Sequence, residues 1–263
     1  MKFKNPILFA LAFSFFSCGG SSENTDISKD TTNVSPDTTA VKTELGPAET
    51  KLPNTNCFSI FSDTYEVEEK LAEIKSTYNS GQILTVVLTT DAELFLEISY
   101  EGKGLEESWQ IDIPVENRFG FEVKLEYTDA NHDDVADELV IWWSQSDGTN
   151  GMLEGFEASS SGIIIFDVIQ RNVMLNFVYD NHYSNYTAGK NANTNSDDYH
   201  AKMADDSDWT TCSFYYTAAL TNGELILSGF DYDVEGDGDC EITPFQEGTY
   251  RYNNTEEHYE IIQ

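Results

Sequence analysis

Apolar and polar residues alternate with a period of two over much of the chain from residue 94 onward. This period places successive side chains on opposite faces of a β-strand, so each alternating segment predicts a strand with one buried face. Leu139–Trp143 is apolar throughout and predicts a central strand. The alternating or strand-like segments are 94–100, 109–113, 119–127, 163–169 and 173–179.

Asn222-Gly223 predicts a two-residue hairpin turn, because both residues tolerate positive φ. Folding the chain about this turn pairs Leu220 with Leu225 and Ala218 with Leu227. The same register then continues outward with the pairs Tyr216–Gly229, Phe214–Asp231 and Cys212–Asp233. Two further strands are expected to close the sheet, at 250–252 and 259–262, and the polar stretch 187–208 is expected to be a long loop.

One segment has a helical pattern. Val67, Leu71, Ile74 and Tyr78 recur at helical spacing, and Gly81 follows as a terminator. Asp63 and Glu66 resemble the two members of a capping box at its start. The fold class expected from all these patterns is mainly β, an antiparallel sheet or sandwich-like domain with one N-terminal helix.

The first 17 residues predict an export signal. Lys2 and Lys4 precede an apolar run from Ile7 to Phe16, and the small Ser17 stands before Cys18. The run is shorter than the roughly 20 residues of a membrane-spanning helix. Residues 18–53 are rich in Ser, Thr, Asn, Asp and Pro, which predicts a disordered tether. Residues 54–263 form the expected globular domain, either as one unit or as two halves, 54–145 and 146–263.

Phe15-Phe16-Ser17-Cys18 resembles the lipobox of Bacteroidota lipoproteins, although the usual Leu three residues before the cysteine is absent. The resemblance implies that Cys18 carries a lipid such as palmitate and anchors the chain to the outer membrane. Whether the domain faces the cell surface or the periplasm stays open.

The charge balance is strongly acidic, with 14 Lys and Arg against 47 Asp and Glu and a net charge of −33. Such a field repels nucleic acids and anionic headgroups and attracts divalent cations. Nucleic acid is therefore excluded as an expected partner.

The segment from Asp129 to Asp137 carries oxygen-bearing side chains at relative positions 1, 3, 5 and 9, namely Asp129, Asn131, Asp133 and Asp137. Calcium takes six to eight oxygen ligands, which a tightly curled loop can supply from alternate residues. The strands predicted on both sides exclude an EF-hand, which needs flanking helices.

This strand-loop-strand motif resembles the Asp-x-Asp/Asn-x-Asp-Gly-x-x-Asp loops of FG-GAP and related β-repeat proteins. The resemblance implies that the four side chains bind calcium. Asp134 stands where that family has glycine. A second segment has the same spacing with glycine restored at position 6, and its implied ligands are Asp231, Asp233, Glu235 and Asp239.

Lipidation of Cys18 leaves an odd number of cysteines, Cys57, Cys212 and Cys240, outside the reducing cytoplasm. Cys240 directly follows the second acidic segment, and the hairpin register sets Cys212 opposite Asp233 at its base. We therefore expect a Cys212–Cys240 disulfide, while pairing of Cys57 with either of them stays open.

Catalytic signatures are missing from the sequence, which has no Gly-x-Ser-x-Gly elbow, no His-Glu-x-x-His and no phosphate-binding glycine loop. The favoured function is a non-catalytic, calcium-stabilised envelope or surface lipoprotein with a binding or structural role toward an extracellular glycan or protein. A secreted hydrolase acting on glycans or peptides, and a sugar-binding subunit of an uptake system, remain alternatives. Aromatic rings of the kind that stack on sugars belong to Trp142, Trp143, Trp209, Tyr179, Tyr183 and Tyr186. We expect these residues to have structural roles instead.

Overall fold

The computed structural model describes residues 50–52, 58–61, 65–113, 120–150, 154–187, 208–236 and 244–262. The expected export signal, Cys18 and almost all of the tether lie outside these residues. Within them the secondary structure is entirely β, and the mainly antiparallel β-fold predicted from the alternating pattern is confirmed. Residues 45–263 belong to one compact unit.

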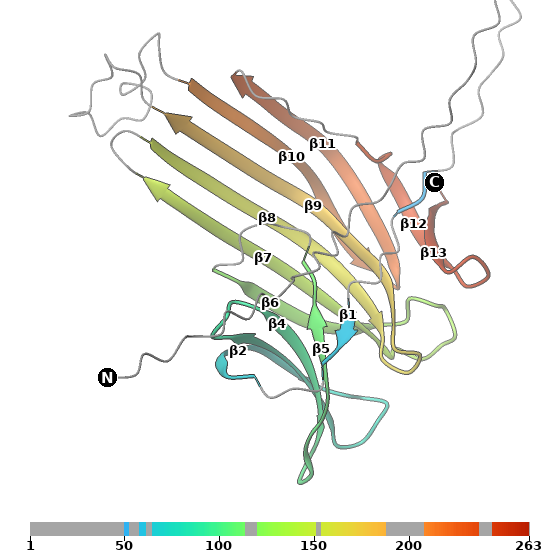
Figure 1. Ribbon diagram of the computed structural model, residues 1–263. Helices are drawn as coiled ribbons and strands as arrows, with labels where there is room; N and C mark the ends of the chain where they lie inside the picture. Colours follow the sequence, from blue (N-terminus) through green and yellow to red (C-terminus); the bar gives the residue numbers. More distant parts are fainter. Residues whose placement is uncertain are drawn as a thin grey trace, which may run out of the picture. The chain divides into compact units, whose positions relative to one another are not determined.

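The strands form two antiparallel sheets (Figure 1). The five-stranded sheet has the order β1-β5-β4-β3-β2, and the eight-stranded sheet runs from β13 to β6 in reverse chain order. The strands are β1 Phe58–Ile60, β2 Val67–Lys75, β3 Gln82–Thr89, β4 Leu94–Tyr100, β5 Gly104–Ile111, β6 Glu122–Thr128, β7 Glu138–Asn150, β8 Glu154–Asp167, β9 Asn172–Thr187, β10 Asp208–Thr221, β11 Glu224–Gly236, β12 Gly248–Asn253 and β13 His258–Ile261.

The chain changes sheet between β5 and β6, whereas the possible domain division at 145/146 falls inside β7. One apolar core joins the two sheets. It combines residues such as Leu96 of β4 and Trp109 of β5 with Leu139 of β7 and Phe166 of β8. Trp109 lies edge-on to Phe166 with 5.7 Å between ring centroids.

A second apolar core lies on the other face of the eight-stranded sheet. Val140 and Ile165 belong to it, while their neighbours Leu139 and Phe166 belong to the first core. The remaining members of the second core include Tyr216 of β10, Leu225 of β11 and Tyr250 of β12. The sheet curls over this core, because Gly223 between β10 and β11 packs on Asp129 between β6 and β7, and Asn254 between β12 and β13 donates to Asn131. The prediction that Leu139–Trp143 is a central strand is confirmed, because β7 pairs with β6 and β8. The structure adds that Leu139–Ile141 and Trp143 are buried.

The predicted N-terminal helix is wrong, because Val67–Lys75 forms strand β2 and pairs with β3. A β-bulge explains the misleading spacing. Lys70 pairs with Val87 and Ala72 with Val86, so Leu71 is an extra residue without its own partner. Because of this insertion, Leu71 and Ile74 both pack on the first core although they are three positions apart in the chain. Tyr78, the next position of the apparent helical stripe, lies in the turn after the strand.

The hairpin about Asn222-Gly223 is confirmed, with positive φ at both turn residues and the predicted pairs Leu220–Leu225 and Ala218–Leu227. Beyond these pairs the predicted register is wrong by one residue. The reason is a bulge on β11 at Gly229, whose φ is +67°. The observed partners further out are Phe214 with Tyr232 and Cys212 with Val234, in place of Asp231 and Asp233.

Candidate functional site

The first acidic segment is the loop between β6 and β7, so the predicted strand-loop-strand setting is confirmed. Its side chains organise the loop backbone. Asp129 accepts hydrogen bonds from the amides of Asp133 and Asp134, at 3.0 and 3.1 Å. Asn131 accepts a second bond from the Asp133 amide at 2.9 Å, and Asp133 accepts one from the Val135 amide at 2.9 Å. Three of the four predicted ligands therefore gather around a single tight turn.

Asp134 takes the position that glycine holds in the FG-GAP loops that this segment resembles in sequence, and its φ is +68°. His132 also has a positive φ, at +60°. The aspartate thus adopts the left-handed conformation that glycine otherwise supplies, which short polar side chains tolerate better than most residues. Replacement of glycine by Asp134 does not prevent the loop from curling.

The fourth predicted ligand, Asp137, is buried with 5% of its surface exposed, and its Oδ1 has no hydrogen-bond partner. Burial, together with the negative charges of Asp133 and Asp167, raises the pKa of the Asp137 carboxyl. Hydrogen bonds from its own backbone and from Glu138 act in the opposite direction. A buried carboxylate with one oxygen lacking a donor is unfavourable unless a cation or a proton compensates it.

Glu138 begins β7 and is fully buried. One carboxyl oxygen accepts the Ala130 amide at 2.8 Å, which ties the start of the loop to its end, while Oε1 has no partner. Burial raises the pKa of Glu138 to about 8. The side chain is therefore mostly protonated at neutral pH in the metal-free domain.

This pKa predicts a pH dependence of stability in a chelating buffer. The folded domain keeps a proton on Glu138 that the unfolded chain loses near pH 4.5. The contribution of Glu138 to the free energy of unfolding is thus fully present below about pH 4.5 and is lost as the pH rises toward 8. The expected slope is about 1.4 kcal/mol per pH unit within that window. Urea unfolding from pH 5 to 8 measures it, and Glu138→Gln is expected to flatten the slope by this amount. Parallel slopes in the two proteins would contradict it.

Two distant turns hold the loop in place. The Asn254 side chain, in the turn between β12 and β13, donates to the Asn131 carbonyl at 2.7 Å. Gly223, in the β10–β11 turn, packs so tightly that a Cβ atom there would lie 2.2 Å from the Asp129 carbonyl oxygen. Tyr259 in turn donates to the Gly223 carbonyl at 3.1 Å. The curl of the sheet therefore brings three turns together at one end.

The second acidic segment does not form the expected curled loop over its described part. Asp231, Asp233 and Glu235 lie within β11, paired with Tyr215, Ser213 and Thr211 of β10. Extended backbone spaces such alternate residues by roughly 7 Å, which separates their carboxylates. Asp239 lies outside the described residues. Throughout the described ranges, no three His, Cys, Asp or Glu side chains converge as a ready-made metal cluster.

Cys212 is disulfide-bonded. Its partner lies outside the described residues, as do Cys18, Cys57 and Cys240. The Cys212–Cys240 pairing remains a prediction.

The tryptophan pair on β7 faces in opposite directions, as the strand period requires. Trp143 is buried in the first core, and Trp142 packs on the second, donating to Glu126 at 2.7 Å and lying edge-on to Tyr179. Tyr183 is exposed at 38%. The side chains of Tyr186 and Trp209 lie outside the description.

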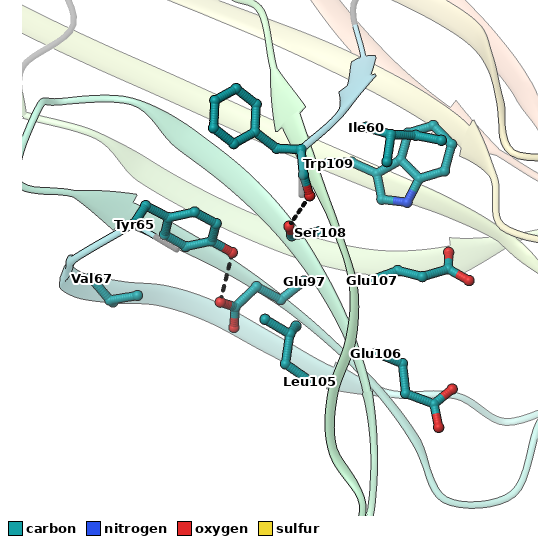
Figure 2. Close-up of a pocket in the computed structure, with 10 residues that line it drawn as sticks. Ile60, Tyr65, Val67, Glu97, Leu105, Glu106, Glu107, Ser108 and Trp109 are labelled. Carbon is teal, nitrogen blue, oxygen red and sulfur yellow. Dashed lines mark hydrogen bonds between the residues drawn. The ribbon is translucent and has the colours of Figure 1, made fainter. Parts of the chain in front are cut away.

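A pocket that the sequence did not indicate lies beside β5 in the five-stranded sheet (Figure 2). Its volume is about 520 Å³. One wall is built by the pairing of Phe58–Ile60 with Trp109–Ile111. Neither a turn motif nor a residue spacing in the sequence predicts this pairing. The lining residues are Ile60, Phe61, Tyr65, Val67, Glu97, Leu105, Glu106, Glu107, Ser108 and Trp109.

No family model matches the chain, and no curated protein or solved structure is significantly similar to it. The described residues contain no helix of the length and apolar character needed to span a membrane.

Proposed function

We propose that this chain is a lipid-anchored envelope protein whose β-rich domain is stabilised by calcium and has a binding or structural role. The observation that carries the proposal is the β6–β7 loop. There Asp129, Asn131 and Asp133 surround one turn, beside the buried Asp137 carboxylate whose Oδ1 lacks a donor.

The donor set suits a hard cation. Carboxylate and amide oxygens are the ligands that calcium prefers, and an oxygen that accepts one loop amide keeps a lone pair for a metal ion. Calcium would also supply the positive charge that offsets the repulsion between Asp133 and Asp137. Asp129, Asn131, Asp133 and Asp137 are the residues that would hold it.

The anchoring part of the proposal rests on the sequence of residues 1–18. The apolar run and Cys18 imply lipidation and outer-membrane attachment, with an extracellular glycan or protein as the partner class. The net charge of −33 favours a cation over an anionic partner.

Calcium at millimolar concentration is expected to raise the melting temperature of the domain, and a chelator to lower it. At a hundredfold excess over Kd the stabilisation is about 2.7 kcal/mol. For a domain of this size that corresponds to a shift of roughly 5–10 °C. Differential scanning fluorimetry across a calcium titration measures the shift.

Asp133→Asn and Asp137→Asn are expected to reduce the calcium response. Asp231→Asn and Asp233→Asn on β11 are matched controls of the same chemistry and should keep it. A melting temperature that changes with neither calcium nor chelator would overturn the calcium proposal. An equal loss of the calcium response in all four variants would show that calcium does not bind at this loop.

A further inference from the structure

The pocket beside β5 lies partly on the outer face of the five-stranded sheet. Leu94, Leu96 and Ile98 of β4 belong to the core between the sheets. Phe95 and Glu97 alternate with them and therefore lie on the opposite face. This surface is not used by the calcium loop or by either apolar core.

Aromatic side chains from the segment after β1 cover Phe95 and form the pocket wall. Tyr65 stacks on Phe95 with 4.1 Å between ring centroids, and Phe61 lies edge-on to it at 5.4 Å. Ser108 fixes the segment by donating to the Phe61 carbonyl at 2.9 Å and accepting the Phe61 amide through its own carbonyl at 3.2 Å. The wall is thus held in place without a ligand.

The mouth of the pocket is apolar and open. Ile60 and Leu105 expose 72% and 54% of their surfaces, and Val67 exposes 49%. Exposed aliphatic residues around a cavity of this volume, which falls in the range of small-molecule sites, are suited to an apolar body.

The polar groups in the pocket carry negative charge. Tyr65 donates to one oxygen of Glu97 at 2.9 Å, and Figure 2 shows the other oxygen turned away from Tyr65. Burial and Glu97 raise the pKa of Tyr65 to about 12, so the hydroxyl remains a donor. Glu106 and Glu107 also line the pocket, whereas none of its ten described lining residues is Lys, Arg or His.

Two of the three carboxylates that line the pocket have a basic residue nearby. Glu107 pairs with Arg171 at 3.1 Å, and Lys103 lies 3.9 Å from Glu106. No basic residue forms a described ion pair with Glu97. A pocket with aromatic walls, aliphatic edges and an oriented carboxylate is complementary to an ammonium group on a carbon skeleton.

We propose that this pocket binds a small organic amine, with its ammonium group on Glu97 and its carbon skeleton between Tyr65, Phe61 and Leu105. The proposal goes beyond the function proposed above, because a small amine is neither a glycan nor a protein. It does not depend on calcium at the β6–β7 loop.

Three probes with one carbon skeleton test the ligand class: 4-phenylbutylamine, 4-phenylbutanol and 4-phenylbutyrate. Isothermal titration calorimetry or ligand-observed NMR is performed on the domain with calcium and again with a chelator. The amine is expected to bind at least about tenfold more tightly than the alcohol, because only its ammonium group forms an ion pair with the Glu97 carboxylate. The carboxylate is expected not to bind.

Two variants locate the site. Glu97→Gln should reduce amine affinity about tenfold and alcohol affinity much less, because only the amine loses an ion pair. Leu105→Lys, at an exposed position, places a cation at the mouth and should abolish amine binding without a change in thermal stability. Glu122→Gln on β6 is the matched control and should bind like the unaltered chain.

Equal affinity for the amine and the alcohol would overturn the proposal, as would absence of binding by the amine or binding indifferent to both pocket variants. Because each titration is repeated with calcium and with chelator, failure of the amine proposal is distinguishable from failure of the calcium proposal.

Discussion

Gly223→Ala is expected to destabilise the domain by about 3–5 kcal/mol, with two physical causes added together. The residue has a φ of +76°, which costs an alanine roughly 1 kcal/mol or more. The new Cβ would also lie 2.2 Å from the Asp129 carbonyl oxygen and 2.8 Å from the Ala130 Cα. Both neighbours are backbone atoms, so the turn between β10 and β11 must move away from the acidic loop.

Gly102→Ala is the matched control for this prediction. Its φ is +79°, yet a Cβ there meets no atom within 4 Å. It should therefore lose only the conformational part, about 1 kcal/mol. Urea unfolding followed by tryptophan fluorescence measures both variants. Similar losses for Gly223→Ala and Gly102→Ala would show that the contact with Asp129 has little energetic weight.

Trp143→Ala is expected to cost about 3–5 kcal/mol, because it empties a large volume in the core between the two sheets. Trp143 is 2% exposed and lies directly opposite Gly162 on β8. A Cβ at residue 162 would lie 2.4 Å from the indole ring. Gly162→Ala should thus cost about 3 kcal/mol by overpacking.

Combining Gly162→Ala with Trp143→Ala should cost less than the sum of the two single losses by at least about 1 kcal/mol, since the alanine methyl then enters vacated space. Equilibrium unfolding of the four proteins completes this double-mutant cycle. Additive losses would mean that Gly162 is needed for a reason other than the indole ring.

The strands of the fold could be predicted because their signals are local. Alternation in Leu94–Tyr100 and the Asn222-Gly223 turn each follow from the conformational preferences of a few neighbouring residues. The failures arise where one inserted residue alters the periodicity. Leu71 in β2 converts a strand pattern into an apparent helical one, and the Gly229 bulge shifts the register of β10 and β11.

The features of the candidate sites also divide into those with local sequence signals and those without. The β6–β7 loop was predictable because its oxygen donors and its flanking strands are contiguous in sequence. The burial of Glu138 and the contact of Gly223 with Asp129 depend on the curl of the sheet, which no local pattern encodes. The pocket joins Phe61 and Tyr65 to Glu97 and Leu105, so its composition becomes visible only after the strands have paired.

The contact between Asn254 and Asn131 spans 123 positions of the chain. Closing so long a loop is slow, because its entropy must be lost before the contact contributes any energy. We therefore expect the acidic turn to form in two stages, first as a local hairpin and later against the C-terminal turns. Under the export and calcium binding proposed above, the oxygen donors would emerge from the membrane channel before strands β12 and β13. We therefore expect tight cation binding to be completed only after the turn between β12 and β13 has met the loop.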